Sequence, residues 1–472
     1  VMNRISIHSS GLTLFGFTLG ALNTLVLYTR LVGVEQYGTI AFILASATLI
    51  SPFISLGMPQ GLLRFYDSIT PIERPRLLGF AILAISLISS ILFGVVYFFN
   101  EWLGQYSEAI NSLPLYESII ILAIALSMGV FELGFALTKL QFKPRFGVFL
   151  KEVYPRLLIT LYLIHLIWSD FYWRPFILFL LLSYLTRALL IWITALKISG
   201  ILPSFNFKGL RLNKILSYSF LVLLGSSLSL FFLEVDKVML FELMTASEVA
   251  NYTVAVFIAT TVAIPFRGYL PLYGPKTARS YHLDSNSFHV ADELKSANDQ
   301  ILDLSSLIVL LLLTALPLIQ LVLPAEFEKG LELIPILIFA KFIDSISGLT
   351  TPLFQYSKFY SKYLVLSILM FALLVLTNVW MIPLYGLKGA AFATALTFCV
   401  FSALKHGLAW RWFRIALVNR SYFWPVLLIV LSSLAWILFE DYAVYVSIGL
   451  LAIFLMQLNQ RGKLREFLKS LI

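Results

Sequence analysis

The chain has 472 residues, of which 60% are hydrophobic and only 12% charged, and its formal net charge is +9. A soluble chain would carry about twice that charged fraction, so a soluble enzyme is excluded. The positive charge does not require a nucleic-acid partner, because the basic bias of cytoplasmic loops explains it. Apolar runs of about twenty residues recur from end to end, which predicts an all-α membrane protein with many spans.

We predict about fourteen spans. In chain order they lie at 9–31, 37–60, 77–99, 116–138, 149–168, 175–196, 215–241, 248–274, 301–323, 332–357, 363–384, 388–411, 422–440 and 443–460. Lys and Arg gather between alternate spans, whereas the other loops carry mostly acids. Since cytoplasmic loops are enriched in basic residues, both termini are predicted to be cytoplasmic. The first apolar run continues as a full span without a small-residue cleavage site, so we expect no cleavable signal.

The two halves of the chain share a spacing of an acidic residue, a tyrosine and two prolines. The members are Glu35, Tyr37, Pro52 and Pro59 in the first half, and Glu248, Tyr252, Pro265 and Pro271 in the second. Proline permits a bend in a membrane helix, and matching bends in two halves are typical of transporters built from repeats. We therefore predict two six-helix lobes with pseudo-two-fold symmetry. These lobes are 1–200 and 215–411, with a cytoplasmic linker at 201–214 and spans 13 and 14 plus a cytoplasmic tail at 412–472.

Charged residues interrupt the apolar sequence between 232 and 279. Glu234, Asp236 and Lys237 lie near the end of one span, and Arg267 lies deep in the next, between two prolines. An ionisable group at membrane depth is expensive, so it marks a functional site by default. This stretch is therefore the first place to look for substrate contacts.

No catalytic constellation is visible in the sequence. There is no glycine-rich phosphate loop followed by a lysine, and the five histidines and one cysteine are not spaced as metal ligands. A membrane-embedded transferase usually carries a long polar loop with acids or histidines, whereas the outer loops of this chain are short. We therefore predict a transporter without a cofactor, a metal or catalytic residues.

Several motifs resemble one family. The run from Asp236 to Tyr252, with DKVML and EVANY, resembles the link between spans seven and eight of bacterial polysaccharide-transporter proteins, although Asn251 replaces a frequent glycine. These proteins are flippases of lipid-linked oligosaccharides in the multidrug/oligosaccharidyl-lipid/polysaccharide (MOP) superfamily. The segment 382–397, IPLYGLKGAAFATALT, is similar to their link between spans eleven and twelve. Further matches in the first half are Arg30, Tyr37-Gly38, Leu56-Gly57 and Arg64.

The resemblance implies a flippase that moves a polyprenyl-diphosphate-linked oligosaccharide, such as an O-antigen or capsule unit, across the bacterial inner membrane by alternating access. The expected partners are this substrate, membrane lipids and glycan polymerases, and the membrane potential, H⁺ or Na⁺ would supply the energy. One alternative is a cation-coupled multidrug exporter of the same superfamily, which would favour an acidic cavity. Another is a membrane enzyme of polysaccharide assembly, which would need longer polar outer loops.

An anionic headgroup needs basic partners in a cavity between the lobes, and the arginine fork matches phosphate oxygens. The candidate substrate-binding residues are Arg30, Arg64, Lys237, Arg267, Tyr37, Tyr252 and Tyr269, with Arg156, Arg187 and Lys341 as further cations. The candidate ion-coupling residues are Glu234, Asp236 and Asp344. Structural roles stay open. Arg30 and Arg64 can reach toward the membrane surfaces, the tyrosines can form interfacial belts, and Lys341 and Asp344, three residues apart, can neutralise each other.

Overall fold

A computed structural model describes residues 2–105, 107, 113–283, 288–355, 357–416 and 422–460. Within these ranges all regular secondary structure is helical. The chain divides into two compact units, Val1–Ala250 and Asn251–Ile472. The predicted all-α class is therefore confirmed, whereas the tail beyond residue 460 and the acidic outer loop around residue 108 lie outside the described residues.

Ten helices in the described ranges are long and apolar enough to cross a membrane, or up to 11 if the two parts of α11 (Leu212–Leu243), bent by 45°, form one span. The remaining predicted spans are also helical, but their helices are short or interrupted. They are α8 (Arg145–Glu152) with α9 (Tyr154–His165), α17 (Ile334–Ser347) with α18 (Thr350–Gln355), and α21 (Phe423–Leu438). Proline lies in the first two residues of α9, where its missing N–H does no harm to the new helix. The count of fourteen spans stays a prediction.

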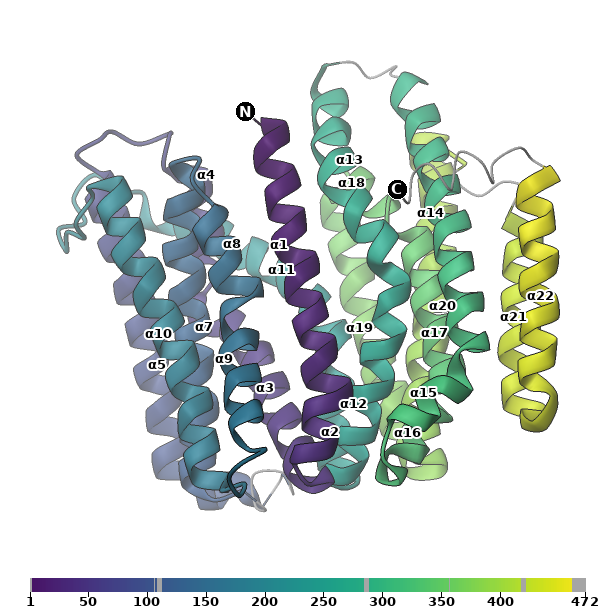
Figure 1. The fold of residues 1–472 in the computed structure, drawn as a ribbon. Helices are drawn as coiled ribbons and strands as arrows, with labels where there is room; N and C mark the ends of the chain where they lie inside the picture. The colour runs from purple at the N-terminus through teal and green to yellow at the C-terminus, as the bar shows by residue number, and fades with distance from the viewer. Residues whose placement is uncertain are drawn as a thin grey trace. The chain divides into compact units, whose positions relative to one another are not determined.

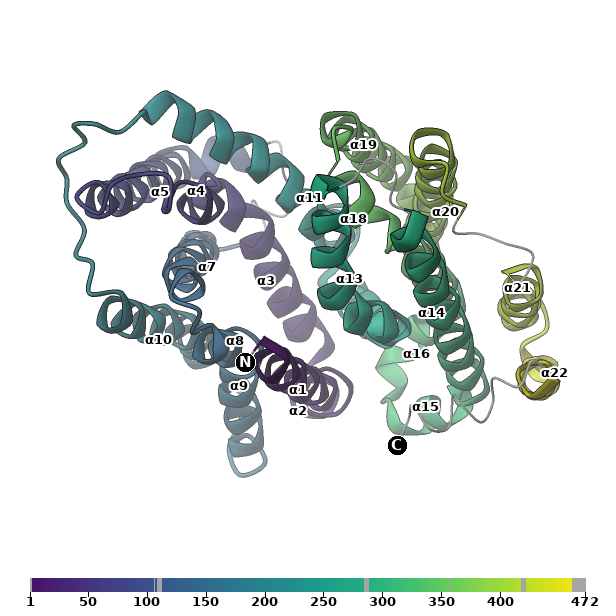
Figure 2. The same cartoon turned by 90° about the horizontal axis from the view of Figure 1, so that it is seen from above.

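The first unit is organised around α7. Its other helices are α1 (Met2–Leu22), a π-helical turn (Asn23–Leu27), α2 (Tyr28–Leu31), α3 (Val34–Ser55), α4 (Met58–Phe65), α5 (Arg74–Gly104), α8, α9, α10 (Trp173–Ser199) and α11. The helix α7 (Leu115–Leu140) packs against α3, α4, α5 and α10 (Figures 1 and 2). Within their apolar windows, 67% of α7 but only 17% of α5 is buried. The core of this unit therefore lies on α7, and α5 lies at its periphery.

The first span is wound irregularly where it contacts α9. Asn23, at the start of the π-helical turn, donates from Nδ2 to the Arg156 carbonyl oxygen at 2.9 Å. Thr160 donates from Oγ1 to Asn23 Oδ1 at 2.7 Å. A buried polar side chain needs such partners, since an unsatisfied amide in an apolar bundle is costly. The irregular turn thus ties α1 to α9.

The second span is interrupted between its two prolines, as the repeat spacing predicts. Pro52 lies inside α3 and Pro59 in the first turn of α4, and the break falls at Leu56 and Gly57, with φ values of 48° and 67°. A Cβ atom on Gly57 would lie 2.1 Å from the Ser219 carbonyl oxygen of α11. Glycine is therefore required both for the left-handed backbone and for the close approach of α11.

The second unit is built on α14, α17 and α20. Its helices are most of α12 (Ala246–Thr260), a 3₁₀ turn (Thr261–Ala263), α13 (Ile264–Leu283), α14 (Phe288–Thr314), α15 (Leu316–Val322), a 3₁₀ turn (Ala325–Phe327), α16 (Glu328–Leu331), α17, α18, α19 (Tyr360–Tyr385), α20 (Leu387–Phe413), α21 and α22 (Glu440–Gln460). The first 3₁₀ turn directly precedes α13, whose second residue is Pro265, so the helix changes its winding close to this proline. The helices α21 and α22 pack against α14 through Leu310, Leu428 and Phe454. This contact attaches the last two helices to the core of the second unit.

The compact units divide at 250/251, whereas the repeat-based lobes divide at 201–214. The difference arises because α11 packs against α3 and α4 of the first unit. The repeat predicts that two sets of helices are related by symmetry. The division into compact units depends on packing alone and does not test that symmetry. The two six-helix lobes therefore stay a prediction.

Replacing Gly57 by alanine should destabilise the protein. The left-handed backbone costs about 1–2 kcal/mol for a residue with a Cβ atom, and the clash with α11 adds to it. We expect a lower Tm for purified Gly57→Ala in detergent. Gly94→Ala is the matched control, because a Cβ atom on Gly94 in α5 meets nothing within 4 Å, and alanine favours a helix by about 0.5–1 kcal/mol. Equal Tm values for the two variants would contradict this assignment.

Candidate functional site

Arg187 of α10 is a buried cation in the middle of a membrane span. The residue is 7% exposed, and it lies fourteen residues into α10, about 21 Å from the start of a helix about 40 Å long. Its guanidinium carbon lies 4.4 Å from the ring centroid of Phe131 and 4.7 Å from that of Tyr184. The guanidinium Nε is buried and has no hydrogen-bond partner among the described residues. Aromatic faces attract a cation, but they do not satisfy its N–H groups.

Other charges surround Arg187. Glu132 accepts from Lys151 at 2.6 Å, and Glu152 accepts from Arg156 at 3.3 Å. Both carboxylates are close enough to interact electrostatically with Arg187, but no carboxylate oxygen of the described residues lies within 4.0 Å of it. Each acid is therefore already paired with another cation.

We call these side chains, with Lys139, the Arg187 site. Lys139 lies with its Nζ 3.9 Å from the ring centroid of Phe135, and it also interacts with Glu132. The site then holds four cations, Lys139, Lys151, Arg156 and Arg187, and two carboxylates, Glu132 and Glu152, so it has a surplus of positive charge. A group of this kind in an apolar bundle attracts an anion.

Two of the three charged residues singled out on α11, Glu234 and Lys237, form an ion pair. Lys237 donates from Nζ to Glu234 Oε2 at 2.7 Å, one turn apart on the helix. Asp236 is 3% exposed and points to another side of α11. Glu234 and Lys237 therefore form an ion pair, and Asp236 is buried separately from it.

The predicted arginines of the first unit lie far apart. Arg30 ends α2, which precedes α3, and Arg64 lies in α4, which follows it. Because α3 has 22 residues, its ends are about 33 Å apart. Both side chains are exposed, as is Arg267 in the second unit. Arg30 and Arg64 therefore do not converge on one phosphate group within the first unit.

The predicted tyrosines take different places. Tyr37 is buried and stacks on Tyr28, with the ring centroids 4.8 Å apart. Tyr252 is 1% exposed, and its hydroxyl lies 3.3 Å from Thr394 Oγ1. Tyr269 is half-buried, donates to Gln300 and stacks on Tyr273. The first two pack in the cores of their units, and only Tyr269 has a partly open face.

Asp344 has a basic neighbour that the sequence does not predict. Lys405 of α20 is 3% exposed, and its Nζ lies 4.0 Å from Asp344 Oδ1 and 4.6 Å from the ring centroid of Phe401. Lys341 lies with its Nζ 4.7 Å from the ring centroid of Phe398. Beside Lys405, both ring nitrogens of His406 are buried without a hydrogen-bond partner in the part of the chain that is described.

Sequence reasoning undervalued Arg187 and missed Lys405. Arg187 is an arginine inside an apolar run, and this pattern indicates a functional site. Its neighbour Phe131, however, comes from α7, which is far away in the sequence. Lys405 lies eight residues before the end of α20, so in the sequence it is easily grouped with the basic residues at that end of the helix. In the sequence, the sign that Lys405 lies inside the apolar part of the helix is that the polar pair Lys405-His406 interrupts it.

Solved structures share this fold. The lipid II flippase MurJ in an inward closed conformation matches with a TM-score of 0.69 and 14% identity, covering 95% of this chain and 98% of the other. An inward-facing MATE family multidrug resistance transporter of the MOP superfamily matches with a TM-score of 0.64 and 14% identity, covering 87% and 98%. The MATE multidrug transporter DinF-BH matches with a TM-score of 0.60 and 14% identity, covering 88% and 96%. At this identity the matches establish a MOP-like fold, and these neighbours are transporters.

At the level of sequence, no curated protein matches the chain. A family model does match: the one described as polysaccharide biosynthesis protein covers residues 6–266. This is more than half of the chain, and it includes α7, α10 and the whole Arg187 site. The chain therefore belongs to the polysaccharide biosynthesis protein family.

Proposed function

We propose that this protein is a flippase that moves a polyprenyl-diphosphate-linked oligosaccharide from the inner to the outer leaflet of the bacterial inner membrane by alternating access. The substrate would be an O-antigen, capsule or related glycan unit. Its diphosphate is the group that cannot cross the hydrocarbon layer unaided, because an ion loses its hydration there. The protein must therefore offer cations at membrane depth.

The observation that carries this proposal is the Arg187 site. Arg187 is buried in a span with no carboxylate within 4.0 Å among the described residues, and its Nε has no hydrogen-bond partner there. Arginine stays charged in proteins and presents donors in a fork that fits phosphate oxygens. A diphosphate would supply the acceptors that this guanidinium lacks.

The family and the fold also support the proposal. The matched family is described by polysaccharide biosynthesis, and the similar structure MurJ is named as a lipid II flippase. These descriptions apply to the family and to MurJ, and we propose the lipid-linked substrate for this chain. Glycan polymerases, which would use the exported units, are the partners that we expect.

A cation-coupled multidrug exporter is the second candidate, because MATE transporters share the fold. A cationic drug would need an acidic group without a cation beside it. Glu132 lies beside Lys151, Glu234 beside Lys237 and Asp344 beside Lys405. The acids of these three pairs are therefore largely neutralised, which argues against binding of a cationic drug at these positions.

The finer architecture and the remaining site residues are part of the same proposal. The architecture is fourteen spans with six-helix lobes at 1–200 and 215–411, and with both termini cytoplasmic. The further substrate-binding candidates are Arg30, Arg64, Lys237, Arg267, Tyr37, Tyr252 and Tyr269, and the ion-coupling candidates are Glu234, Asp236 and Asp344. Of the exposed arginines, Arg267 is the one to test first, because it lies deep in its predicted span.

Replacing Arg187 by methionine should separate function from stability. Arg187 has no ion-pair partner of its own among the described residues, and Glu132 and Glu152 keep Lys151 and Arg156 as partners. Methionine removes the cost of burying the charge, so we expect an unchanged or higher Tm. Glycan export in cells should nevertheless fall at least tenfold, because the phosphate loses its fork of donors. Arg187→Lys should recover export only in part, since a point charge does not replace the fork.

Lys388→Met is the matched control for the loss of a cation. Lys388 pairs with Glu332 at 2.7 Å, and both side chains are about half exposed, so this pair contributes little. Export should be unchanged in this variant. Wild-type export by a well-folded Arg187→Met protein would assign Arg187 a structural role only.

Arg267 gives an independent test in the second unit. If its exposed side chain contacts the diphosphate, Arg267→Ala should abolish export at a normal protein level. Arg267→Lys should restore part of it. Protein level is measured by immunoblot of membranes and export by surface glycan. Full export by the alanine variant would remove Arg267 from the site.

The membrane potential should drive the reaction. The cell interior is negative, and each charge moved through 100 mV is worth about 2.3 kcal/mol. A diphosphate with about two charges would gain on the order of 4–5 kcal/mol on moving outward. In proteoliposomes, an inside-negative potential without an ion gradient should therefore speed outward flipping. A rate that depends on Na⁺ or pH alone would instead point to Glu234, Asp236 and Asp344.

A further inference from the structure

The second unit carries cations and aromatic rings together at one end of the helix pair α19 and α20. These helices pack against each other and are joined at Gly386, so the start of α19 lies beside the end of α20. The rings of Phe359 and Trp412 stack there, with their centroids 4.7 Å apart. We call this group the α19–α20 patch, and its members are Phe359, Lys362, Trp410, Arg411, Trp412 and Arg414.

Two cations of the patch lie over aromatic rings. Lys362 Nζ is 5.7 Å from the ring centroid of Phe359 and 5.8 Å from that of Trp412. The guanidinium carbon of Arg414 is 5.7 Å from the ring centroid of Trp410. Aromatic faces attract a cation, but they do not accept all of the N–H bonds that an ammonium or a guanidinium can donate. These contacts therefore hold the cations and leave donors for a ligand.

No acid neutralises the cations of the patch. Lys362, Arg411 and Arg414 are exposed, and no carboxylate oxygen of the described residues lies within 4.0 Å of them. By contrast, Lys388 at the other end of α20 pairs with Glu332 at 2.7 Å. The patch therefore presents three positive charges and attracts an anion.

Arg414 has a backbone conformation that is unfavourable for an arginine. It caps α20 with a φ of 57°, in the left-handed region. Glycine adopts this conformation most easily, and α10 ends in that way on Gly200, with a φ of 64°. A residue held in such a conformation supports a functional role for its side chain. At Arg414 the side chain supplies the guanidinium over Trp410.

The patch lies at the level where membrane-spanning helices meet lipid headgroups. The candidate spans are Tyr360–Tyr385 and Leu387–Phe413, so every member of the patch lies within about one helical turn of a span end. Val365 and Leu369, each 57% exposed, follow Lys362 at spacings i+3 and i+7 on the same face of α19. A ligand at this level finds cations for an anionic head and an apolar face for a hydrocarbon tail.

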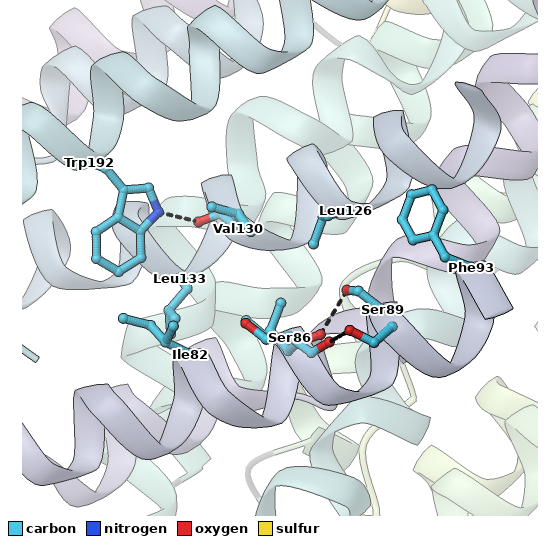
Figure 3. Close-up of a pocket in the computed structure, with 10 residues that line it drawn as sticks. Ile82, Ser86, Ser89, Phe93, Leu126, Val130, Leu133 and Trp192 are labelled. Carbon is cyan, nitrogen blue, oxygen red and sulfur yellow. Dashed lines mark hydrogen bonds between the residues drawn. The ribbon is translucent and has the colours of Figure 1, made fainter. Parts of the chain in front are cut away.

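The groove of the first unit offers only the apolar part of this chemistry. Its volume is about 660 Å³, and it is lined by α5, α7 and Trp192 of α10 (Figure 3). Ser89 donates to the Ile85 carbonyl oxygen at 2.7 Å, and the Trp192 indole N–H donates to the Val130 carbonyl oxygen at 2.9 Å. None of its lining residues in the described part of the chain is charged. The groove therefore fits hydrocarbon and does not select a headgroup.

We propose that the α19–α20 patch binds the phosphate of an anionic phospholipid headgroup. Arg411 and Arg414 present guanidinium donors that fit phosphate oxygens, and Lys362 adds a point charge. Trp410 is 57% exposed, and tryptophan is enriched at the headgroup level of membranes. The inference concerns the lipids around the second unit, and it does not depend on which substrate the protein moves.

The test compares two phospholipids with equal acyl chains, the anionic dioleoyl phosphatidylglycerol and the zwitterionic dioleoyl phosphatidylcholine. Purified full-length protein in detergent is titrated with each, and bound lipid is measured by native mass spectrometry. The wild type should bind phosphatidylglycerol about tenfold more tightly. Arg414→Gly removes the cation and the unfavourable backbone together, so Tm should be unchanged or higher, while binding of phosphatidylglycerol should weaken about fivefold.

Lys362→Gln should also weaken binding of phosphatidylglycerol about fivefold. Lys388→Gln is the matched control, because it removes a paired cation at the other end of α20, and it should bind like the wild type. Phosphatidylcholine should bind equally to all variants.

Two results would overturn the lipid site. One is binding of phosphatidylglycerol by both Arg414→Gly and Lys362→Gln at the wild-type level, or equal binding of the two lipids by the wild type. The other is displacement of phosphatidylglycerol by glycerol 3-phosphate at an equal concentration, which would assign the patch to a soluble phosphate. Neither result bears on the flippase proposal, which is tested at Arg187.

Discussion

The burial of one guanidinium among apolar helices is the constraint from which the rest of the first unit can be understood. A charge that leaves water loses several kcal/mol of hydration even after the protein relaxes. Arg187 recovers part of this through the faces of Phe131 and Tyr184, but its neighbours Glu132 and Glu152 are paired with other cations. An arrangement that leaves a buried cation without its own counterion is poor for stability alone, and it is suited to an anionic ligand.

The balance of charge, rather than the fold, is the basis on which we argue for a class of substrate. Flippases and multidrug exporters share the architecture, so the fold does not choose between them, and function has to be argued from the site. In Glu234 with Lys237, and in Asp344 with Lys405, each acid lies beside a cation. The surplus of charge at the Arg187 site is positive, which matches a phosphate better than a cationic drug.

The two faces of α7 offer different chemistry because successive residues of a helix point about 100° apart. Phe131 faces the guanidinium, whereas Val130 and Leu133 line the groove. The peripheral helix α5 lines the same groove with three serines and three larger apolar side chains, and it is itself little buried. The helix α7 thus contacts an ionic group on one side and an apolar groove on the other.

The sequence alone determined the membrane class, the helical character of the apolar runs and a bend near Pro52 and Pro59, because hydrophobic length and the backbone chemistry of proline and glycine are local properties. It also carried the family resemblance, in motifs that span only a few residues. Only the tertiary structure decided which charges pair. Phe131 and Arg187 are far apart in sequence, and Lys405 reaches Asp344 from another helix. Those contacts depend on how helix faces pack, and an apolar run that is hydrophobic on all sides does not reveal which face turns inward.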